Sequence, residues 1–153
     1  YNIGDIFLSG SNSSTRGCIL YFNNSRLAPE REAEIKKITI IDRLNTPSSF
    51  HITVADPEDE WRGNDAYYIG SKAKILLGYK DDYKELIIGE VTGCSSFFKR
   101  NNIIQVIVSG QNNLHRLKRY KRIQTFNDMT VSDIISNITD QYGLNAEVDS
   151  LDY

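Results

Sequence analysis

The sequence predicts a mainly β protein, an antiparallel barrel or sandwich that is followed by one α-helix. Three observations lead to this prediction. Apolar and polar residues alternate in several runs within residues 35–108, and a period of two is the mark of a half-buried strand. Turn-forming clusters separate these runs at short intervals, as in barrels and sandwiches. Beyond them lies one segment, residues 130–143, whose apolar residues follow a helical period.

The first two strands of this body form the clearest hairpin. Residues 35–41 predict a strand whose alternation is broken at Lys36 and Lys37, a step that a β-bulge would reconcile. A turn cluster, N-T-P-S-S, follows at residues 45–49. The next run alternates strictly, and we expect its apolar members to face the core: Phe50, Ile52 and Val54.

The central strands follow a long irregular connection, residues 56–70. Residues 70–79 predict a strand with Ala73, Ile75, Leu77 and Tyr79 on one face, and the turn falls at Asp81-Asp82. The pattern resumes with Leu86, Ile88 and Val91 on one face and a bulge near Gly89. After a turn at residues 97–102, residues 103–108 are almost all apolar, which is typical of a strand covered on both faces or lying at an interface.

The helix has recognisable ends. Thr130 stands where an N-cap belongs, and Asp133 favours the exposed amides of the first turn. Gly143 is a natural stop. The apolar stripe between them consists of Val131, Ile134, Ile135, Ile138 and Tyr142. Residues 144–148 then predict the beginning of another strand, so we expect an α/β segment to start here.

These patterns divide the chain into three parts. Residues 1–34 form an irregular N-terminal segment with short strands at 2–8 and 17–22, and a helical turn or a linker at 27–34. Residues 35–124 form the β-barrel domain. Residues 125–153 contain the helix and the strand that begin the next subdomain. Because the first residue is Tyr1 and no signal-peptide pattern follows, we expect this chain to be a piece of a longer protein.

Composition excludes several classes of protein. A net charge of −2 over 153 residues gives no general attraction to nucleic acid or to an anionic membrane. No apolar run reaches the roughly 20 residues that span a bilayer, so we expect a soluble chain. Cys18 and Cys94 are far apart and match no metal or redox spacing, and we expect free thiols.

Little in the sequence predicts catalysis or metal binding. The acidic residues within 56–60 lack the register of a calcium loop, so an exposed loop is the expectation. His51 and His115 lie near no nucleophile motif and at no metal spacing. We therefore expect no enzyme activity, no cofactor, no metal and no small-molecule substrate.

A basic cluster offers an alternative function. It surrounds Tyr120 and consists of Arg116, Lys118, Arg119, Lys121 and Arg122. Cations on phosphates and a tyrosine stacked on a base would suit a small β-barrel that binds single-stranded nucleic acid. The acidic balance of the whole chain favours a solvated strand or a polar protein interface instead, so nucleic acid is the alternative and not the expectation.

The order of several motifs resembles a known family. The motifs are F-H-I-T-V-A-D-P (50–57), I-G-S-K-A-K-I-L-L-G-Y (69–79), L-I-I-G-E-V-T-G (86–93), L-H-R-L-K-R (114–119) and T-F-N-D-M-T-V-S-D-I-I (125–135). Together they resemble the baseplate hub proteins of contractile phage tails and injection systems. That family includes the VgrG-type spike proteins and the phage late-control gene D proteins. The resemblance covers residues 35–148, and the order of the motifs carries it.

The resemblance implies a fold and a set of partners. The fold would be a barrel related to the tail tube protein, within a hub that forms a homotrimer between the tube ring and the spike. Such a hub is assembled in the bacterial cytoplasm, lies in the baseplate of a virion or of a type VI-like injection particle, and meets membranes only through the spike. The N-terminal 34 residues are longer and more polar than the family pattern.

Five residues are the candidate protein contacts. Three are aromatic residues of the polar 56–70 loop, because aromatic side chains often anchor interfaces: Trp61, Tyr67 and Tyr68. Packing over the end of the barrel is an equally good interpretation for them. The other two, Arg119 and Arg122, belong to the basic cluster.

Overall fold

The computed structural model describes residues 6–7, 17–56, 60–61, 67–79, 82–98 and 104–148. The chain forms two compact units, Tyr1–Asn112 and Asn113–Tyr153. The sequence patterns placed boundaries after residues 34 and 124 instead. Strand β2 and the strands of the predicted barrel domain share one core, to which Leu20 and Ile38 both contribute.

The first unit is an eight-stranded antiparallel sheet with a short helix, α1 (Pro29–Glu34). The sheet order is β1-β4-β5-β8-β7-β6-β2-β3. The strands are β1 (Ile6–Phe7), β2 (Gly17–Phe22), β3 (Ser25–Arg26), β4 (Ile35–Ile41), β5 (Ser49–Ala55), β6 (Lys72–Tyr79), β7 (Asp82–Phe98) and β8 (Ile104–Asn112). The mainly β, antiparallel fold class is confirmed. Among the described residues the end strands β1 and β3 do not pair, so the sheet is a curled half-barrel.

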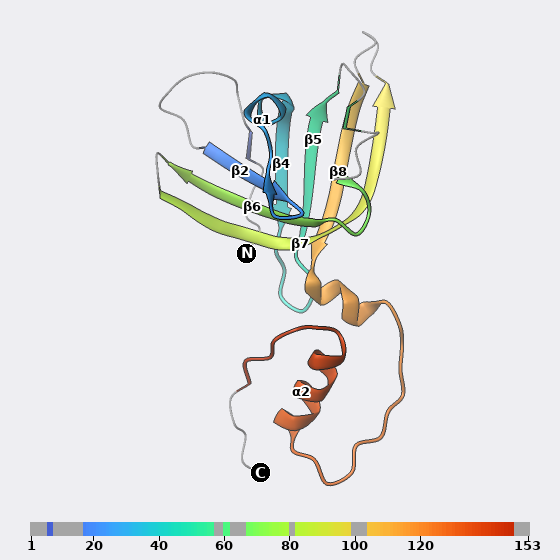
Figure 1. Ribbon diagram of the computed structural model, residues 1–153. Helices are drawn as coiled ribbons and strands as arrows, with labels where there is room; N and C mark the ends of the chain where they lie inside the picture. Colours follow the sequence, from blue (N-terminus) through green and yellow to red (C-terminus); the bar gives the residue numbers. More distant parts are fainter. Residues whose placement is uncertain are drawn as a thin grey trace. The chain divides into compact units, whose positions relative to one another are not determined.

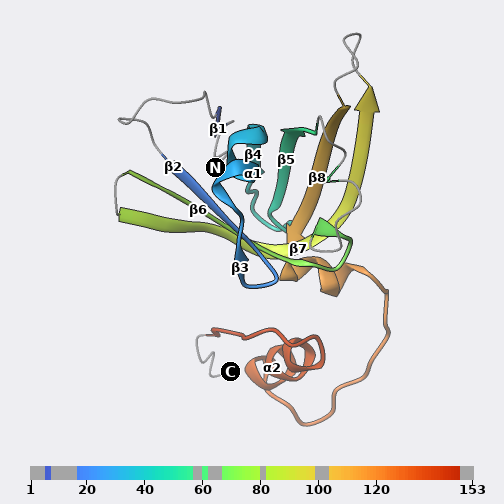
Figure 2. The ribbon, with the colours of Figure 1, turned by 45° about the horizontal axis from the view of Figure 1, so that its top comes forward.

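Strand β7 joins two groups of strands. Its residues 82–90 pair with β6, and its residues 89–98 pair with β8. In Figure 1 the β2 and β6 ribbons cross the upright β4, β5 and β8, and β7 bends from the first group into the second. Figure 2 shows the same bend from another direction. The core lies in the angle between the two groups.

The predicted hairpin of β4 and β5 is confirmed in register and in facing. The pairing shifts between Ile35 and Lys37, which is the predicted bulge. Phe50, Ile52 and Val54 are 0% exposed. Full burial of such side chains contributes about 1.5–3 kcal/mol each, so the facing of this strand is strongly specified.

The predicted facing of β7 is confirmed for Val91 and is wrong for Ile88. Ile88 is 46% exposed, whereas Ile87 and Val91 are buried. The cause is a register shift in the β6–β7 pairing, where Ile75 pairs with Ile87 but Leu76 pairs with Glu85. Leu86 is the extra residue, and one extra residue reverses which face the following side chains take. A second shift lies between Val91 and Gly93, so bulges flank Gly89 on both sides.

Two further differences concern strand extents and coverage. Strand β7 continues through Phe98, past the predicted start of a turn at residue 97. Asp82 belongs to β7 and pairs with Tyr79, so the strand begins inside the predicted turn. In β8, Val106 and Val108 are buried while Ile104 and Ile107 are half-buried, so one face lies in the core and the other is partly open.

The remaining N-terminal predictions are confirmed where the structure describes them. Residues 17–22 form β2, and residues 29–34 form the helical turn α1. Of the predicted strand at 2–8, residues 6–7 form β1, and the rest lies outside the described residues.

The second unit contains a 3-10 helix, η2 (Asn113–Lys118), and helix α2 (Val131–Gln141). The predicted helix ends are confirmed. Thr130 and Asp133 form a reciprocal capping box, in which the Asp133 backbone N–H donates to Thr130 Oγ1 at 3.2 Å. Gly143 has a φ of +63°, a left-handed value that glycine adopts at little cost. None of the described helices is long and apolar enough to cross a membrane.

The strand predicted at residues 144–148 does not form. These residues are irregular. A strand needs a neighbour for its backbone hydrogen bonds, and no described strand pairs with this segment.

Candidate protein-interaction site

The loop after β5 is fixed at its start by Asp56, which is 0% exposed. Its carboxylate accepts hydrogen bonds from the backbone N–H groups of Glu60, at 2.8 Å, and Trp61, at 3.2 Å. Its own N–H donates to the Ile104 carbonyl at 2.8 Å. The acidic cluster was expected to be exposed, and for Asp56 this is wrong. A buried carboxylate needs such donors, and they come from the loop itself.

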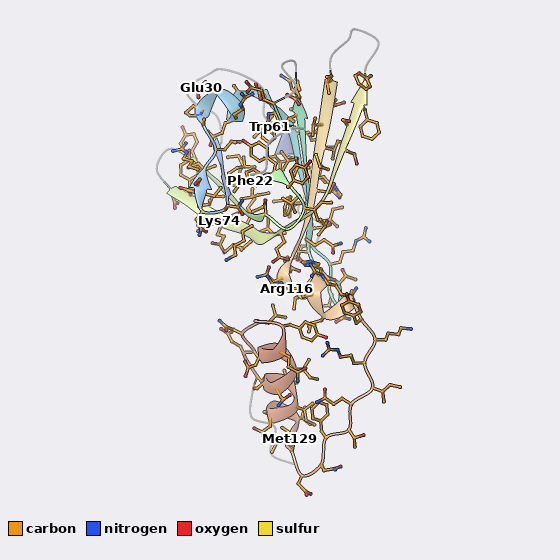
Figure 3. All side chains as sticks on the ribbon, turned by 45° about the vertical axis from the view of Figure 1, so that its right-hand side comes forward. Phe22, Glu30, Trp61, Lys74, Arg116 and Met129 are labelled. Atoms are coloured by element: carbon orange, nitrogen blue, oxygen red, sulfur yellow. The ribbon has the colours of Figure 1, made fainter. Side chains whose placement is uncertain are left out.

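Trp61 and Tyr67 lie in the core. Their rings stack with centroids 4.4 Å apart, and Tyr67 meets the Phe22 ring edge-on at 4.9 Å. The Trp61 Nε1–H donates to Glu34 Oε2 of α1 at 2.5 Å. Figure 3 shows Trp61 and Phe22 among the strands of the first unit. Burial raises the pKa of the Tyr67 hydroxyl, with Arg31 opposing the rise and Glu34 adding to it. These two aromatic residues therefore pack over the sheet, as the alternative interpretation proposed.

Ion pairs hold the same loop to α1. Arg31 Nη1 lies 2.9 Å from Glu34 Oε1, and the Arg31 guanidinium also contacts the carboxylate of Glu60.

Tyr68 differs from its neighbours, because it is 56% exposed beside Ile69, which is 68% exposed. Of the three predicted aromatic contacts, Tyr68 alone presents a large surface to a partner.

The basic cluster is engaged within the second unit. Arg116 Nη1 donates to the Tyr142 carbonyl at 3.0 Å, beside the end of α2. Arg119 Nη2 lies 2.9 Å from His115 Nε2. The Arg122 guanidinium lies over the Tyr142 ring at 5.7 Å. Cations near the end of a helix stabilise it, so Arg116 and Arg122 have a structural role that the sequence pattern did not reveal.

Tyr120, at the centre of that cluster, is 69% exposed. A cavity of about 300 Å³ lies beside it, lined by residues of the basic segment and of α2, including Leu117, Phe126 and Ile138. Arg119 and Arg122 thus belong to the second unit and the three aromatic candidates to the first. The five predicted contacts are therefore divided between the two units.

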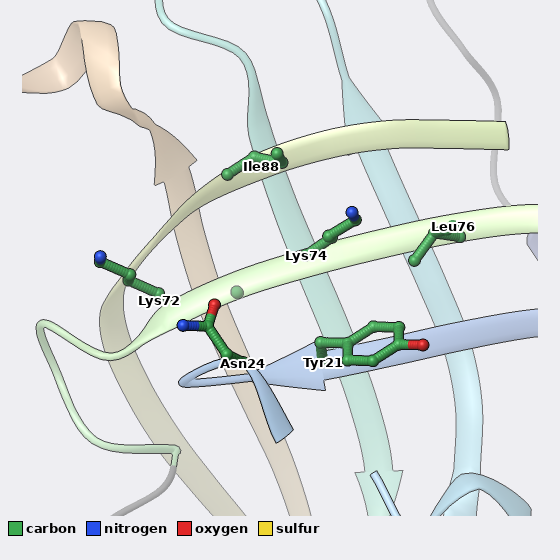
Figure 4. A pocket seen from close by; sticks show the side chains of 7 residues that line it. Tyr21, Asn24, Lys72, Lys74, Leu76 and Ile88 are labelled. Atoms are coloured by element: carbon green, nitrogen blue, oxygen red, sulfur yellow. The ribbon is translucent and has the colours of Figure 1, made fainter. Parts of the chain in front are cut away.

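A groove on the first unit was not predicted. It has a volume of about 450 Å³, and its lining comes from β2, β6 and β7 with the turn after β2 (Figure 4): Tyr21, Asn24, Lys72, Ala73, Lys74, Leu76 and Ile88. Lys74 pairs with Glu85 at 3.2 Å. Tyr21 and Leu76 become neighbours only through the β2–β6 register, which no local pattern reveals. Apolar side chains between charged ones can receive a protein side chain.

Groups with reactive chemistry are sparse in the described part of the chain. His51 Nδ1 lies 2.9 Å from Ser109 Oγ, across β5 and β8. No hydrogen bond joins His51 to a carboxylate among the described residues. The same residues contain no group of three or more His, Cys, Asp or Glu side chains that could hold a metal ion.

The two free cysteines should differ in reactivity. Cys18 is buried, and desolvation, with Glu32 adding to it, raises the pKa of its thiol to about 12. At pH 8 roughly one Cys18 in 10,000 is then a thiolate, the reactive form. The pKa of Cys94 is also raised, by partial burial and by Asp56, but Cys94 is exposed. We expect a thiol reagent to label Cys94 alone in the folded protein, as mass spectrometry of the labelled chain can check. Labelling of Cys18 at a similar rate would contradict this burial.

Three comparisons relate the chain to known proteins. A family model described as the Alg8 N-terminal domain matches residues 20–153. No curated protein matches the chain by sequence. Among solved structures, the fold is similar to the crystal structure of the tail protein from Neisseria meningitidis MC58, with a TM-score of 0.59 and 14% identity.

The structural match covers 82% of this chain and 33% of the tail protein. The chain therefore spans about a third of the length of that relative, and at this identity the match shows a tail-protein-like fold. The family model covers most of the chain. The chain belongs to the Alg8 N-terminal domain family.

Proposed function

We propose that the chain is a structural module of a contractile tail or injection particle, and that within it the chain serves as a baseplate hub domain of the VgrG type. The observation that carries this proposal is the fold match to a tail protein over 82% of the chain. The order of the five motifs given above adds to it. The module acts by protein–protein assembly and carries out no catalysis.

The surfaces of the chain suit such a role. The buried Trp61 and Tyr67, with the Arg31 ion pairs, fix the described residues of the 56–70 loop to the sheet and to α1, and rigid surfaces bind partners without a large ordering cost. The groove beside Tyr21 and the exposed Tyr68 and Ile69 offer apolar contacts. The proposed partners are two further copies of the parent polypeptide, the tail tube ring and the spike, within a baseplate assembled in the bacterial cytoplasm.

The mass of the parent polypeptide in solution tests this proposal. Light scattering at several concentrations should give a stable trimer, because a hub has to match the symmetry of the tube. Particles purified from the producing bacterium should contain the polypeptide at the end of the tube. A monomer at every concentration, together with absence from the particles, would sink the hub assignment.

An oligonucleotide titration separates the hub from the nucleic-acid alternative. We expect no binding at low salt, because Arg116, Arg119 and Arg122 already have partners within the chain. Binding that weakens steeply with salt, and that is lost in Arg119→Glu and Arg122→Glu, would favour the alternative. Reversal of Lys72 in the first unit provides a control with the same change in charge.

A further inference from the structure

Helix α1 connects the two ends of the curled sheet. It follows β3, the last strand in the sheet order, and leads directly into β4, which lies near the other end beside β1. The residues that flank it are anchored, because Leu27 is 5% exposed and Ile35 is 2% exposed. The Leu27 N–H also donates to the Leu20 carbonyl of β2 at 2.8 Å. Figure 2 shows α1 between the β2 and β4 ribbons.

Polar contacts tie α1 to the loop after β5. The Trp61 Nε1–H donates to the carboxylate of Glu34. The Arg31 guanidinium contacts the carboxylates of Glu34 and Glu60. The side chains of Arg31 and Glu60 are 25% and 44% exposed, and ion pairs that water reaches contribute little to stability. None of the residues of α1 is buried, so the apolar burial that fixes strands such as β5 does not hold this helix.

The tie between α1 and β3 is weaker. Arg26 Nε of β3 lies 3.6 Å from Glu32 Oε1 of α1. That oxygen is buried and accepts no hydrogen bond from a described residue, and desolvation of a carboxylate oxygen without such a bond is costly. Burial, and after it the charge of Glu32, raises the pKa of the Cys18 thiol on β2. Glu32 therefore lies near Cys18, and α1 covers this part of β2.

The helix has little stability of its own. It has six residues, and isolated helices shorter than about 12 residues are marginal in water. Its N-cap residue is Ala28, which offers no side-chain oxygen to the first N–H groups. Segments with few buried apolar contacts open locally before the whole protein unfolds. By its length, its cap and its contacts, α1 has the properties of such a segment.

We propose that α1 is a strap that closes the half-barrel, and that it opens as a unit while the sheet stays folded. When closed, it links β3 to the loop after β5 by side-chain contacts, whereas a full barrel closes by strand pairing. When open, it turns about the residues beside Leu27 and Ile35, which stay buried, and uncovers Cys18. Because its ties are charged, the strap responds to ionic strength.

The strap and all its contacts lie in the first unit, so this proposal goes beyond the hub function and does not depend on it. Its test measures the reaction of one thiol in the isolated chain. The hub function is tested by mass and by location in particles. Either test can fail while the other succeeds.

The reaction of Cys18 with a small neutral thiol reagent measures the opening. Mass spectrometry of the digested chain separates this thiol from the exposed Cys94, which should react much faster. If α1 opens locally, the rate at Cys18 stays nearly constant over low urea concentrations, because local opening exposes little new surface. Amide exchange of β5, followed by NMR, reports unfolding of the sheet. It should be far slower and should rise steeply with urea.

A matched pair of variants tests the ties. Arg31→Gln removes the contacts with Glu34 and Glu60, and labelling of Cys18 should become about two- to fivefold faster, the range for such ion pairs. Arg43→Gln makes the same change in charge at an exposed position between β4 and β5, and it should leave the rate unchanged. Circular dichroism and the exchange of β5 confirm that both variants fold.

Salt provides an independent test. At 1 M the screening length falls to about 3 Å, so labelling of Cys18 should become faster in the parent chain. In Arg31→Gln the same salt should have little further effect, because the principal ion pairs are already absent.

Three outcomes would overturn the proposal. One is labelling of Cys18 that rises with urea in parallel with the amide exchange of β5, since α1 would then open only with the whole sheet. Another is an equal rate in Arg31→Gln and Arg43→Gln, since the ion pairs would then not hold the strap. The third is labelling that does not respond to salt in the parent chain.

Discussion

Replacement of Trp61 by alanine is expected to lower the free energy of unfolding by about 3–5 kcal/mol, the usual cost of removing a large buried ring. Trp61 is 1% exposed, stacks on Tyr67 and donates a hydrogen bond to Glu34. The variant loses all three interactions and leaves a cavity between α1 and the sheet. Urea unfolding followed by circular dichroism measures the change, since Trp61 is the only tryptophan and its fluorescence disappears with it.

Two variants sharpen that result. Trp61→Phe keeps an aromatic ring but loses the bond to Glu34, and we expect an intermediate loss. Tyr68→Ala removes a side chain that is 56% exposed, and we expect a change within about 0.5 kcal/mol, as for most surface positions. Equal losses in Trp61→Ala and Tyr68→Ala would show that the two aromatic residues do not differ in burial as described.

Replacement of Gly110 by alanine is expected to destabilise the fold by about 1–3 kcal/mol or more, as overpacking of a tight core does. A Cβ at Gly110 would lie 2.1 Å from Phe50 Cζ and 2.5 Å from the Glu90 carbonyl oxygen. Both are far inside contact distance, and the carbonyl belongs to the point where β7 passes from one group of strands to the other. Thermal and urea unfolding measure the loss.

Gly93→Ala is the matched control, because a Cβ there would meet nothing within 4 Å. We expect its stability to stay within about 0.5 kcal/mol of the parent chain. The double variant Gly110→Ala with Phe50→Leu should cost less than the sum of the two single changes, since the shorter side chain relieves one of the two clashes. Strict additivity would mean that Phe50 does not restrict Gly110.

Much of the candidate site depends on contacts that local patterns do not encode. Trp61 and Tyr67 looked like surface anchors because the residues around them are polar. In the folded chain they are buried. Glu34 and Arg31 of α1, which lie about 30 residues earlier in the sequence, contact Trp61 and Glu60 and fix this part of the loop to α1. Arg116 and Arg122 of the basic cluster likewise have a partner that is distant in sequence, Tyr142, which follows α2.

The sequence by itself determined the features that depend on a few neighbouring residues. The alternation of β5, the bulge after Ile35, the Thr130–Asp133 cap and the stop at Gly143 all follow from side chains within one or two turns or strand steps. Only the tertiary structure decided the facing of Ile87 and Ile88, the groove beside Tyr21 and the point at which β7 changes its neighbour from β6 to β8. Each of these depends on which strand lies alongside and on where its register shifts. Pairing between segments distant in sequence sets that register. The fold class could therefore be predicted from the sequence, and the interaction surfaces could not.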